Sequence, residues 1–230
     1  MKKIIDKIYN KRLVIKPWGS EYVIYQDKNA LAITLLKINF KDQTSLHCHP
    51  KKKTGFILLD GSAEIQLGLW KSETKLFKSP SKLMIRAGLF HSIKCASKRG
   101  LIALEFETPV KKNDLVRYQD YYGRSLKPYE GKNFIKNLGK KDIIFKSIKA
   151  NPLQKYKIGK VNVKLKTYKS FSNIINQKNK TIFAVIDGAV TDNKNRNILS
   201  KGDIIKTGTF IKLSKKFKIK NKLVLLSVSK

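Results

Sequence analysis

The feature that most constrains the fold is a series of short apolar runs, which are separated from one another by turn residues. They include residues 32–38, 56–59, 102–106 and 223–228, and they are rich in β-branched and aromatic side chains. Short runs of this composition are typical of strands, whereas a helix would repeat its apolar residues every three or four positions. A helical period is suggested only near residues 2–11. The sequence therefore predicts an all-β protein, either a sandwich or a barrel.

An internal repeat indicates two halves. Residues 55–63 (GFILLDGSA) are echoed by residues 182–190 (IFAVIDGAV), and residues 82–91 (KLMIRAGLFH) by residues 202–211 (GDIIKTGTFI). Each half then carries a strand, an Asp-Gly turn, a strand and a further strand that closes at a glycine turn. Chance similarity among β-turns is the alternative explanation.

The boundary between the halves is expected in the lysine-rich stretch 127–141, which proline and glycine residues interrupt. We therefore expect one domain over residues 1–127 and a second over residues 140–230. A chain of 230 residues is long enough for two domains with cores of their own.

The net charge of +34, from 50 Lys and Arg against 16 Asp and Glu, raises nucleic acid as a partner. Only six of the fifty are Arg, however, and base and phosphate recognition favours the bidentate fork of Arg. The excess is Lys, which rises together with Asn and Ile, as expected of a genome rich in A and T. We therefore disfavour nucleic acid, and an anionic small substrate or an acidic polymer stays compatible with the charge.

A reducing, cytoplasmic location is expected. No apolar run approaches the roughly 18 residues of a membrane span, and Asp6 and Lys7 break any signal-peptide apolar region. The two cysteines, Cys48 and Cys95, are too few for a disulfide framework. We expect no membrane partner.

All three histidines of the chain fall at positions that favour a shared site. His47 and His49 are two residues apart, so in a strand both point to the same face. His91 follows the glycine turn of another strand, and if that strand lies alongside, the three imidazoles converge. Three imidazoles with open positions could hold a metal. Cys48 points to the opposite face, where we expect it to pack and not to ligate.

These residues resemble the cupin superfamily. Its first motif reads H-x-H, three or four residues, E, six residues, G, and its second reads P-x-G-x-x-H. Residues 47–61 match the first motif except that Thr54 stands where the acid should be, and residues 86–91 match the second except for Arg86. With the internal repeat, the resemblance implies two tandem cupin barrels, each a double-stranded β-helix or jelly roll.

Within the cupins, the chain resembles the mannose-6-phosphate isomerase domain, which also forms the C-terminal part of bifunctional mannose-1-phosphate guanylyltransferases. The opening signature is matched by residues 16–22 (KPWGSEY) and the closing one by residues 114–124 (DLVRYQDYYGR), so the resemblance covers about residues 12–125. It implies a divalent metal (Zn, Fe, Ni or Mn) on His47, His49 and His91. The missing acid at Thr54 predicts weaker metal occupancy.

The same resemblance implies where a substrate would lie. Arg117 and Arg124 carry over as contacts to the sugar phosphate, with Arg117 also counted as catalytic. Apart from the resemblance, Trp18 and Tyr122 lie near the motifs and could stack on a sugar ring, with core or rim packing as the alternative. An aldose–ketose isomerase also needs a base, for which we choose Glu105. The alternatives on neighbouring positions are Glu107 and Glu64.

The second half lacks this site. The positions that match the three histidines are Ile174, Asn176 and Ile211. We therefore expect the C-terminal barrel to be structural or to offer a surface to a partner.

The sequence thus favours a metal-dependent cupin that acts on a sugar or sugar phosphate, similar to mannose-6-phosphate isomerase, in carbohydrate or surface-polysaccharide metabolism. The first alternative is a non-catalytic sugar-binding or scaffold cupin, and the second, less favoured, is a nucleic-acid-binding protein. A homodimer is left open.

Overall fold

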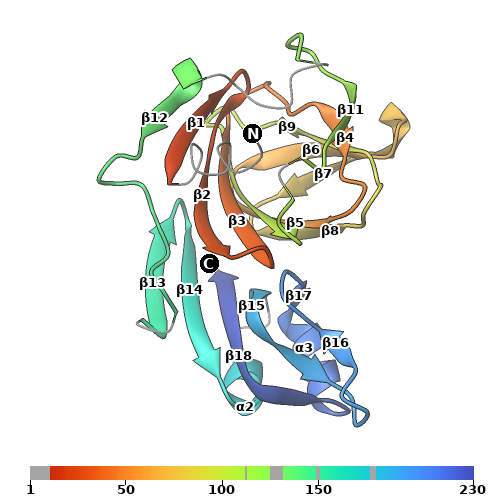
Figure 1. Cartoon of the computed structure of the whole chain (residues 1–230), viewed down its shortest axis with the longest axis vertical. Coiled ribbons are helices and arrows are strands. Elements are labelled where there is room, and N and C mark those ends of the chain that lie inside the picture. Colours follow the sequence, from red (N-terminus) through yellow and green to blue (C-terminus); the bar gives the residue numbers. More distant parts are fainter. Residues whose placement is uncertain (1–10, 112, 125–131, 149–150, 177–179) are drawn as a thin grey trace.

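The computed structural model describes residues 11–111, 113–124, 132–148, 151–176 and 180–230. Strands dominate these residues, which confirms the predicted all-β class (Figure 1). The described helices are short, and none of them is long and apolar enough to cross a membrane.

The first half consists of two antiparallel sheets. The larger has the strand order β12-β1-β2-β3-β10-β5-β8 and the smaller the order β11-β4-β9-β6-β7. The larger sheet contains β1 (Arg12–Lys16), β2 (Gly19–Asp27), β3 (Leu31–Ile38), β5 (Lys53–Asp60), β8 (Ser81–Ile85), β10 (Leu101–Thr108) and β12 (Ile135–Asn137). The smaller contains β4 (Leu46–Cys48), β6 (Ser62–Leu67), β7 (Thr74–Lys78), β9 (His91–Cys95) and β11 (Val116–Gln119). The 3-10 helices η1 (Lys71–Glu73) and η2 (Lys132–Phe134) precede β7 and β12.

One hydrophobic core fills the space between these two sheets. The larger sheet contributes Leu36, Phe56 and Leu58, and the smaller contributes Ile65 and Ile93. Because side chains alternate along a strand, the intervening residues of β3 and β5 point to the other face of the larger sheet. Those residues are apolar too, which explains the continuous apolar runs in the sequence.

The second half is a single six-stranded sheet with two short helices. Its strand order is β13-β14-β18-β15-β16, and β17 pairs with β15. A separate core lies between this sheet and the helices and includes Ile174, Phe183, Phe210 and Leu225. The elements are β13 (Leu153–Ile158), β14 (Val161–Tyr168), α2 (Ser172–Ile175), β15 (Ile182–Thr191), β16 (Asn197–Leu199), β17 (Ile204–Lys206), α3 (Thr207–Ser214) and β18 (Lys218–Ser229).

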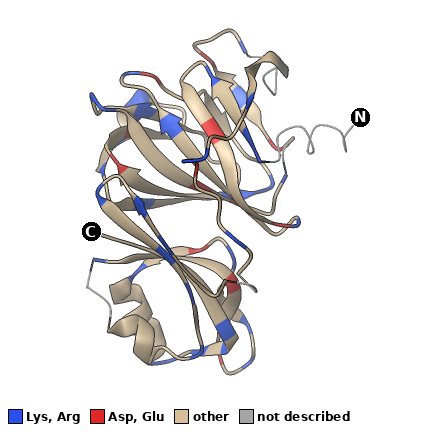
Figure 2. Ribbon diagram, turned by 90° about the vertical axis from the view of Figure 1, so that its left-hand side faces the viewer, with Lys and Arg blue, Asp and Glu red and all other residues tan. Residues whose placement is uncertain are grey.

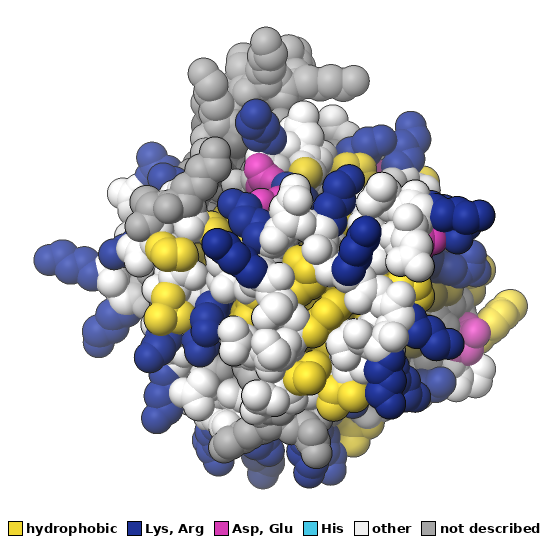
Figure 3. Space-filling model, turned by 90° about the horizontal axis from the view of Figure 1, so that it is seen from below, with side chains coloured by type: hydrophobic (Ala, Val, Ile, Leu, Met, Phe, Trp, Pro, Cys, Tyr) yellow, Lys and Arg dark blue, Asp and Glu magenta, His cyan; other side chains and the backbone are white. Residues whose placement is uncertain are grey.

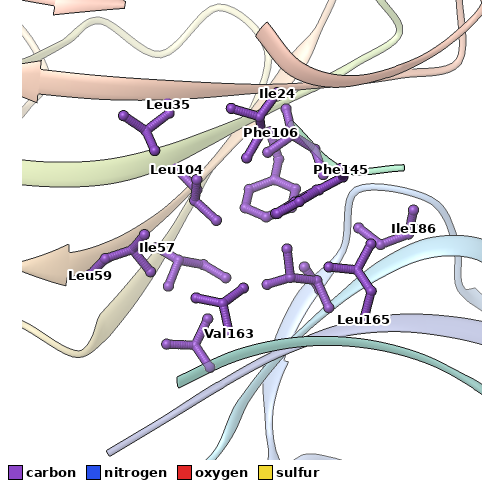
Figure 4. Packing of buried hydrophobic residues seen from close by; sticks show 14 of the residues in the cluster. Ile24, Leu35, Ile57, Leu59, Leu104, Phe106, Phe145, Val163, Leu165 and Ile186 are labelled. Carbon is purple, nitrogen blue, oxygen red and sulfur yellow. The ribbon is translucent and has the colours of Figure 1, made fainter. Parts of the chain in front are cut away.

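A third core joins the halves. Ile57, Leu104 and Phe106 project from the outer face of the larger sheet toward Val163 and Leu165 of the second half (Figure 4). The sheet of each half contributes side chains to this shared core, and many of them are fully buried. The two halves are therefore packed sheet against sheet.

Ion pairs also cross between the halves at the edge of this core. Lys201 of the second half lies 2.5 Å from Asp27 in β2 and 2.9 Å from Asp187, and Lys53 in β5 lies 2.6 Å from Asp203. All of these side chains are partly exposed, so each exposed pair adds little to stability. Of the three pairs, Lys201–Asp27 and Lys53–Asp203 connect the two halves, whereas Lys201–Asp187 lies within the second half.

The Asp-Gly pairs of the internal repeat lie in different settings: Gly61 separates β5 from β6, whereas Gly188 lies within β15 at an irregularity in its pairing with β18, so the turn expected there is not formed. Gly61 and Gly188 have positive φ angles of 88° and 82°. A Cβ atom at Gly61 would lie 2.5 Å from the backbone oxygen of Gly100, and one at Gly188 2.0 Å from that of Lys222. Glycine is needed at both positions because φ is positive and a neighbouring backbone lies too close for a Cβ atom.

The later part of the repeat differs between the halves. β9 begins at His91, whereas the matching segment of the second half forms α3, with Phe210 buried against Phe183 and Phe171. Ile174, which matches His47, is buried in α2. Short helices thus occupy the places where the first half has the strands that carry its histidines.

Lys and Arg residues are distributed over both halves (Figure 2). The end of the molecule that the second half forms shows hydrophobic side chains near its middle, with Lys and Arg spread around them (Figure 3). Acidic side chains are few on this end, in keeping with the net charge of +34.

Candidate metal centre

Two neighbouring strands bring the three histidines together. His47 in β4 pairs directly with His91 in β9, and His49 follows on the same face as His47. The ring centroids are 4.5 Å apart for His47 and His91, 4.9 Å for His47 and His49, and 5.5 Å for His49 and His91. Each residue offers one ligand nitrogen, and these nitrogens lie within 4.8 Å of one another. The predicted convergence is confirmed, while Cys48 between them is buried and outside this group.

Backbone carbonyl oxygens fix the tautomer of each ring. Nδ1 of His47 donates to the oxygen of Ser45 at 2.7 Å, that of His49 to the oxygen of Asp114 at 2.5 Å, and that of His91 to the oxygen of Leu89 at 3.0 Å. A carbonyl oxygen only accepts, so Nδ1 carries the hydrogen and Nε2 keeps its lone pair. Ligating histidines in metal sites are commonly oriented by such a second hydrogen bond.

The Nε2 atoms are placed as ligand atoms would be. Those of His49 and His91 are buried and have no hydrogen-bond partner among the described residues. A buried polar atom without a partner is unfavourable unless something binds it. The donor set therefore fits a divalent metal of the zinc, iron or nickel type, which imidazole nitrogens suit.

Electrostatics keep the three rings neutral. Burial lowers the pKa of His49 and of His91 to about 4, and it lowers the pKa of His47 well below its usual value. The nearby charge of Lys52 lowers all three pKa values further. Neutral imidazole is the form that binds a metal, so the rings are ready to ligate near neutral pH.

The histidines line a cavity inside the first barrel that also contains many charged side chains. Its cations come from strands of both sheets and from the loops at the mouth of the barrel, and its acids come from the larger sheet alone. The charged lining residues are Lys16, Lys52, Arg117, Arg124, Glu21, Glu105 and Glu107. Such a mixture of cations and acids beside a metal site suits a polar, anionic ligand better than an apolar one.

Most of the substrate residues that the sequence indicated lie at this cavity. Arg117 in β11 pairs in register with His47, and its guanidinium donates to the backbone oxygen of Arg124 at 3.3 Å. Arg124 is buried and forms a 2.6 Å ion pair with Asp120. Trp18 and Glu105 also line the cavity.

Tyr122 lies apart from the lining residues. Its hydroxyl accepts a hydrogen bond from the backbone of Gln43 at 3.3 Å, and the Arg124 guanidinium lies 5.2 Å from the centre of its ring. Tyr122 thus contacts Arg124, which lines the cavity, and packs against the core between the two sheets.

Two residues of the site had no assigned role in the sequence reasoning. Asp114 holds His49 through its carbonyl oxygen, and its carboxylate accepts from the backbone N–H of Lys51 at 2.9 Å. Lys52 is 3% exposed and pairs with the buried Glu107. The signal for Asp114 was its place at the start of the closing signature, whereas Lys52 was hidden in a run of three lysines.

Comparison with known proteins fits this geometry. The sequence model of the family described as "Mannose-6-phosphate isomerase C-terminal" matches residues 5–120, half of the chain. The chain belongs to this family. It is thus a cupin of the mannose-6-phosphate isomerase C-terminal family, and the match spans all three histidines. Among curated proteins, no sequence matches it.

Several solved structures are similar to part of this family member. A Klebsiella pneumoniae protein with a double-stranded β-helix domain is 15% identical, with a TM-score of 0.39, over 44% of this chain and 79% of that one. KdgF from Halomonas sp. is 12% identical, with a TM-score of 0.39, over 44% of this chain and 90% of that one. The capsular polysaccharide assembling protein CapF from Staphylococcus aureus is 11% identical, with a TM-score of 0.42, over 47% of this chain and 34% of that one.

Proposed function

We propose that the first barrel is a metal-dependent site for a sugar phosphate and that it interconverts an aldose phosphate and a ketose phosphate. One observation carries this proposal. Three neutral imidazoles direct ligand nitrogens to a common point, in a cavity that Arg117 and Arg124 also line. A metal site beside a pair of arginines suits a substrate with both a carbonyl or hydroxyl group and a phosphate.

The parts of the site divide the work of isomerisation. A bound divalent metal would supply a Lewis acid that stabilises negative charge on the substrate oxygens. Glu105 has a carboxylate in the cavity and would move the proton between adjacent carbons. Arg117 would bind the phosphate through its planar fork of N–H donors, and Arg124, which Asp120 orients, would assist it.

The experiment is to load the purified protein with Zn²⁺, Mn²⁺, Fe²⁺ or Ni²⁺ and to follow mannose 6-phosphate and fructose 6-phosphate by NMR. We expect interconversion with at least one metal, none after chelation, and a large loss in Glu105→Gln with metal binding retained. The absence of conversion with every metal, together with no binding of either sugar phosphate, would contradict the proposal.

A second candidate function is a non-catalytic sugar-binding or scaffold protein. Thr54 in place of the motif acid favours it, because its buried hydroxyl has no hydrogen-bond partner in the part of the chain that the structure describes and carries no charge to offer a metal. This candidate predicts that a sugar phosphate binds, with or without metal, and is recovered unchanged.

Nucleic acid remains the least favoured partner. Lys and Arg residues are spread over both halves (Figure 2), and the sequence has no basic run with aromatic residues interleaved at regular spacing. Binding of unrelated DNA that persists above physiological salt would favour this candidate over both sugar-binding functions.

A further inference from the structure

The carboxylate that Thr54 fails to supply is present one strand away. In the pairing of β10 with β5, Glu107 stands directly opposite Thr54. Directly opposed residues of an antiparallel pair point to the same face, with Cβ atoms about 4.5–5.5 Å apart. Glu107 thus enters the barrel beside the position of the family's acid.

Glu107 is held there by a buried cation. Its side chain is 8% exposed and forms an ion pair with Lys52, whose side chain is 3% exposed. Both residues line the cavity of the three histidines. A buried ion pair is seldom more stabilising than apolar side chains of the same size, so stability alone is a weak reason for this pair.

The charge of the site gives a stronger reason. Three neutral imidazoles do not offset the charge of a divalent metal. The metal would therefore repel the buried cation of Lys52 nearby, and this repulsion is strong because the site is buried. The carboxylate of Glu107 already neutralises the positive charge of Lys52 through their ion pair. In this structure it is not part of the cluster of ligand atoms that the three histidines form. Among the acids that line the cavity, Glu107 is the one that stands opposite Thr54, and its carboxylate would reach a metal by giving up some or all of its contact with Lys52.

We propose that Glu107 is the fourth protein ligand of the metal centre, in place of the acid that is missing at Thr54, and that Lys52 holds its carboxylate when no metal is bound. This inference rests on the proposed function, because it requires that the three histidines bind a metal. On metal binding the Glu107 carboxylate exchanges the Lys52 ammonium for the metal. The ammonium of Lys52 then faces the cavity, where it can meet an anionic ligand.

The test is the affinity of the full chain for Zn²⁺ and Co²⁺, measured by competition with a chelator. We expect Glu107→Gln to weaken both metals roughly 10–100-fold or more, the range for loss of a supporting group or ligand. The visible absorption of bound Co²⁺, which reports its ligand set, should also change. Glu64→Gln, which removes a half-exposed carboxylate of β6, is the control and should bind like wild type.

A second pair of variants separates ligation from charge and covers the case in which Glu107→Gln folds poorly with Lys52 unpaired. Lys52→Met should tighten metal binding, because it frees the carboxylate and removes a cation. Lys52→Met/Glu107→Gln leaves the net charge of wild type, yet it should bind metal at least about tenfold more weakly than wild type, since a ligand is lost.

The outcomes are distinct. Weaker binding by the double variant, with an altered Co²⁺ spectrum, supports Glu107 as a ligand. Equal affinity and an unchanged spectrum in the double variant would overturn this inference and leave the three-histidine site standing, as would a loss confined to Glu105→Gln. A wild-type chain that binds neither metal would overturn the metal-dependent function as well.

Discussion

Replacing Leu226 with alanine is expected to destabilise both halves of the chain together. Leu226 lies on β18 and is fully buried in the core that the halves share. A buried Leu→Ala change leaves a cavity and costs about 2–5 kcal/mol. Nine side chains of the first half are buried in this core, and at about 1.5–3 kcal/mol each they outweigh the roughly 5–15 kcal/mol net stability of a typical domain. Neither half should stay folded when the other unfolds.

Urea denaturation with two probes tests this coupling. Tryptophan fluorescence reports the first half, which contains both Trp18 and Trp70, whereas far-UV circular dichroism reports both halves. Leu226→Ala should lower the midpoint of both signals by the same amount. Leu225→Ala serves as the matched variant, because Leu225 is equally buried but faces the second half's own core. If Leu225→Ala lowers the circular dichroism midpoint and leaves the fluorescence midpoint unchanged, the halves unfold separately and the reasoning is wrong.

Three further predictions follow from the site and its turns. The pKa of His49 and of His91 is about 4 in the folded chain and near 6.5 when unfolded. The unfolded state of the metal-free protein therefore binds more protons between these values, and each histidine should remove about 1.4 kcal/mol of stability per pH unit as pH falls from 6.5 toward 4. Equal urea midpoints at pH 6.5 and pH 5 would contradict this. Arg117→Ala should leave metal content unchanged and weaken sugar-phosphate binding, measured by calorimetry, by about 1.5–3 kcal/mol, the worth of a charge-assisted hydrogen bond; unaltered affinity would remove Arg117 from the phosphate site. Gly61→Ala should lower the thermal midpoint more than Gly88→Ala, since both have positive φ but only at Gly61 does a Cβ meet a backbone oxygen, at 2.5 Å. Equal losses would show that the close approach has no effect.

The strands and the histidine cluster could be predicted from the sequence because both depend on local periodicity. The two-residue spacing of His47 and His49 fixes a shared face once the segment is a strand. The spacing of the two cupin motifs brings His91 alongside, and the observed pairing of His47 with His91 confirms it. The short apolar runs likewise predicted strands, and in the structure β3 and β5 place apolar residues in the cores on both faces of the larger sheet.

The remaining features depend on contacts between distant segments. Lys52 reads as a solvated lysine, since its partner Glu107 is 55 residues away on another strand. The core between the halves could not be predicted either, because an apolar outer face does not reveal what covers it. In α3, Phe210 and Leu213 are three residues apart, a spacing that shares one face only in a helix, and both pack into the second half's own core together with Phe171 and Phe183; the match to the strand-bearing repeat of the first half concealed this.

The central claim, that the three histidines form a metal centre, is tested most directly by the metal content of the purified chain. After incubation with Zn²⁺ and removal of the free metal, we expect one bound ion per wild-type chain and far less in His49→Ala, because loss of one of the three imidazoles weakens the site enough for the metal to be removed. Asn176→Ala, at the matching position of the second half, should retain wild-type metal content. Equal metal content in His49→Ala and wild type, or no metal in either, would contradict the claim.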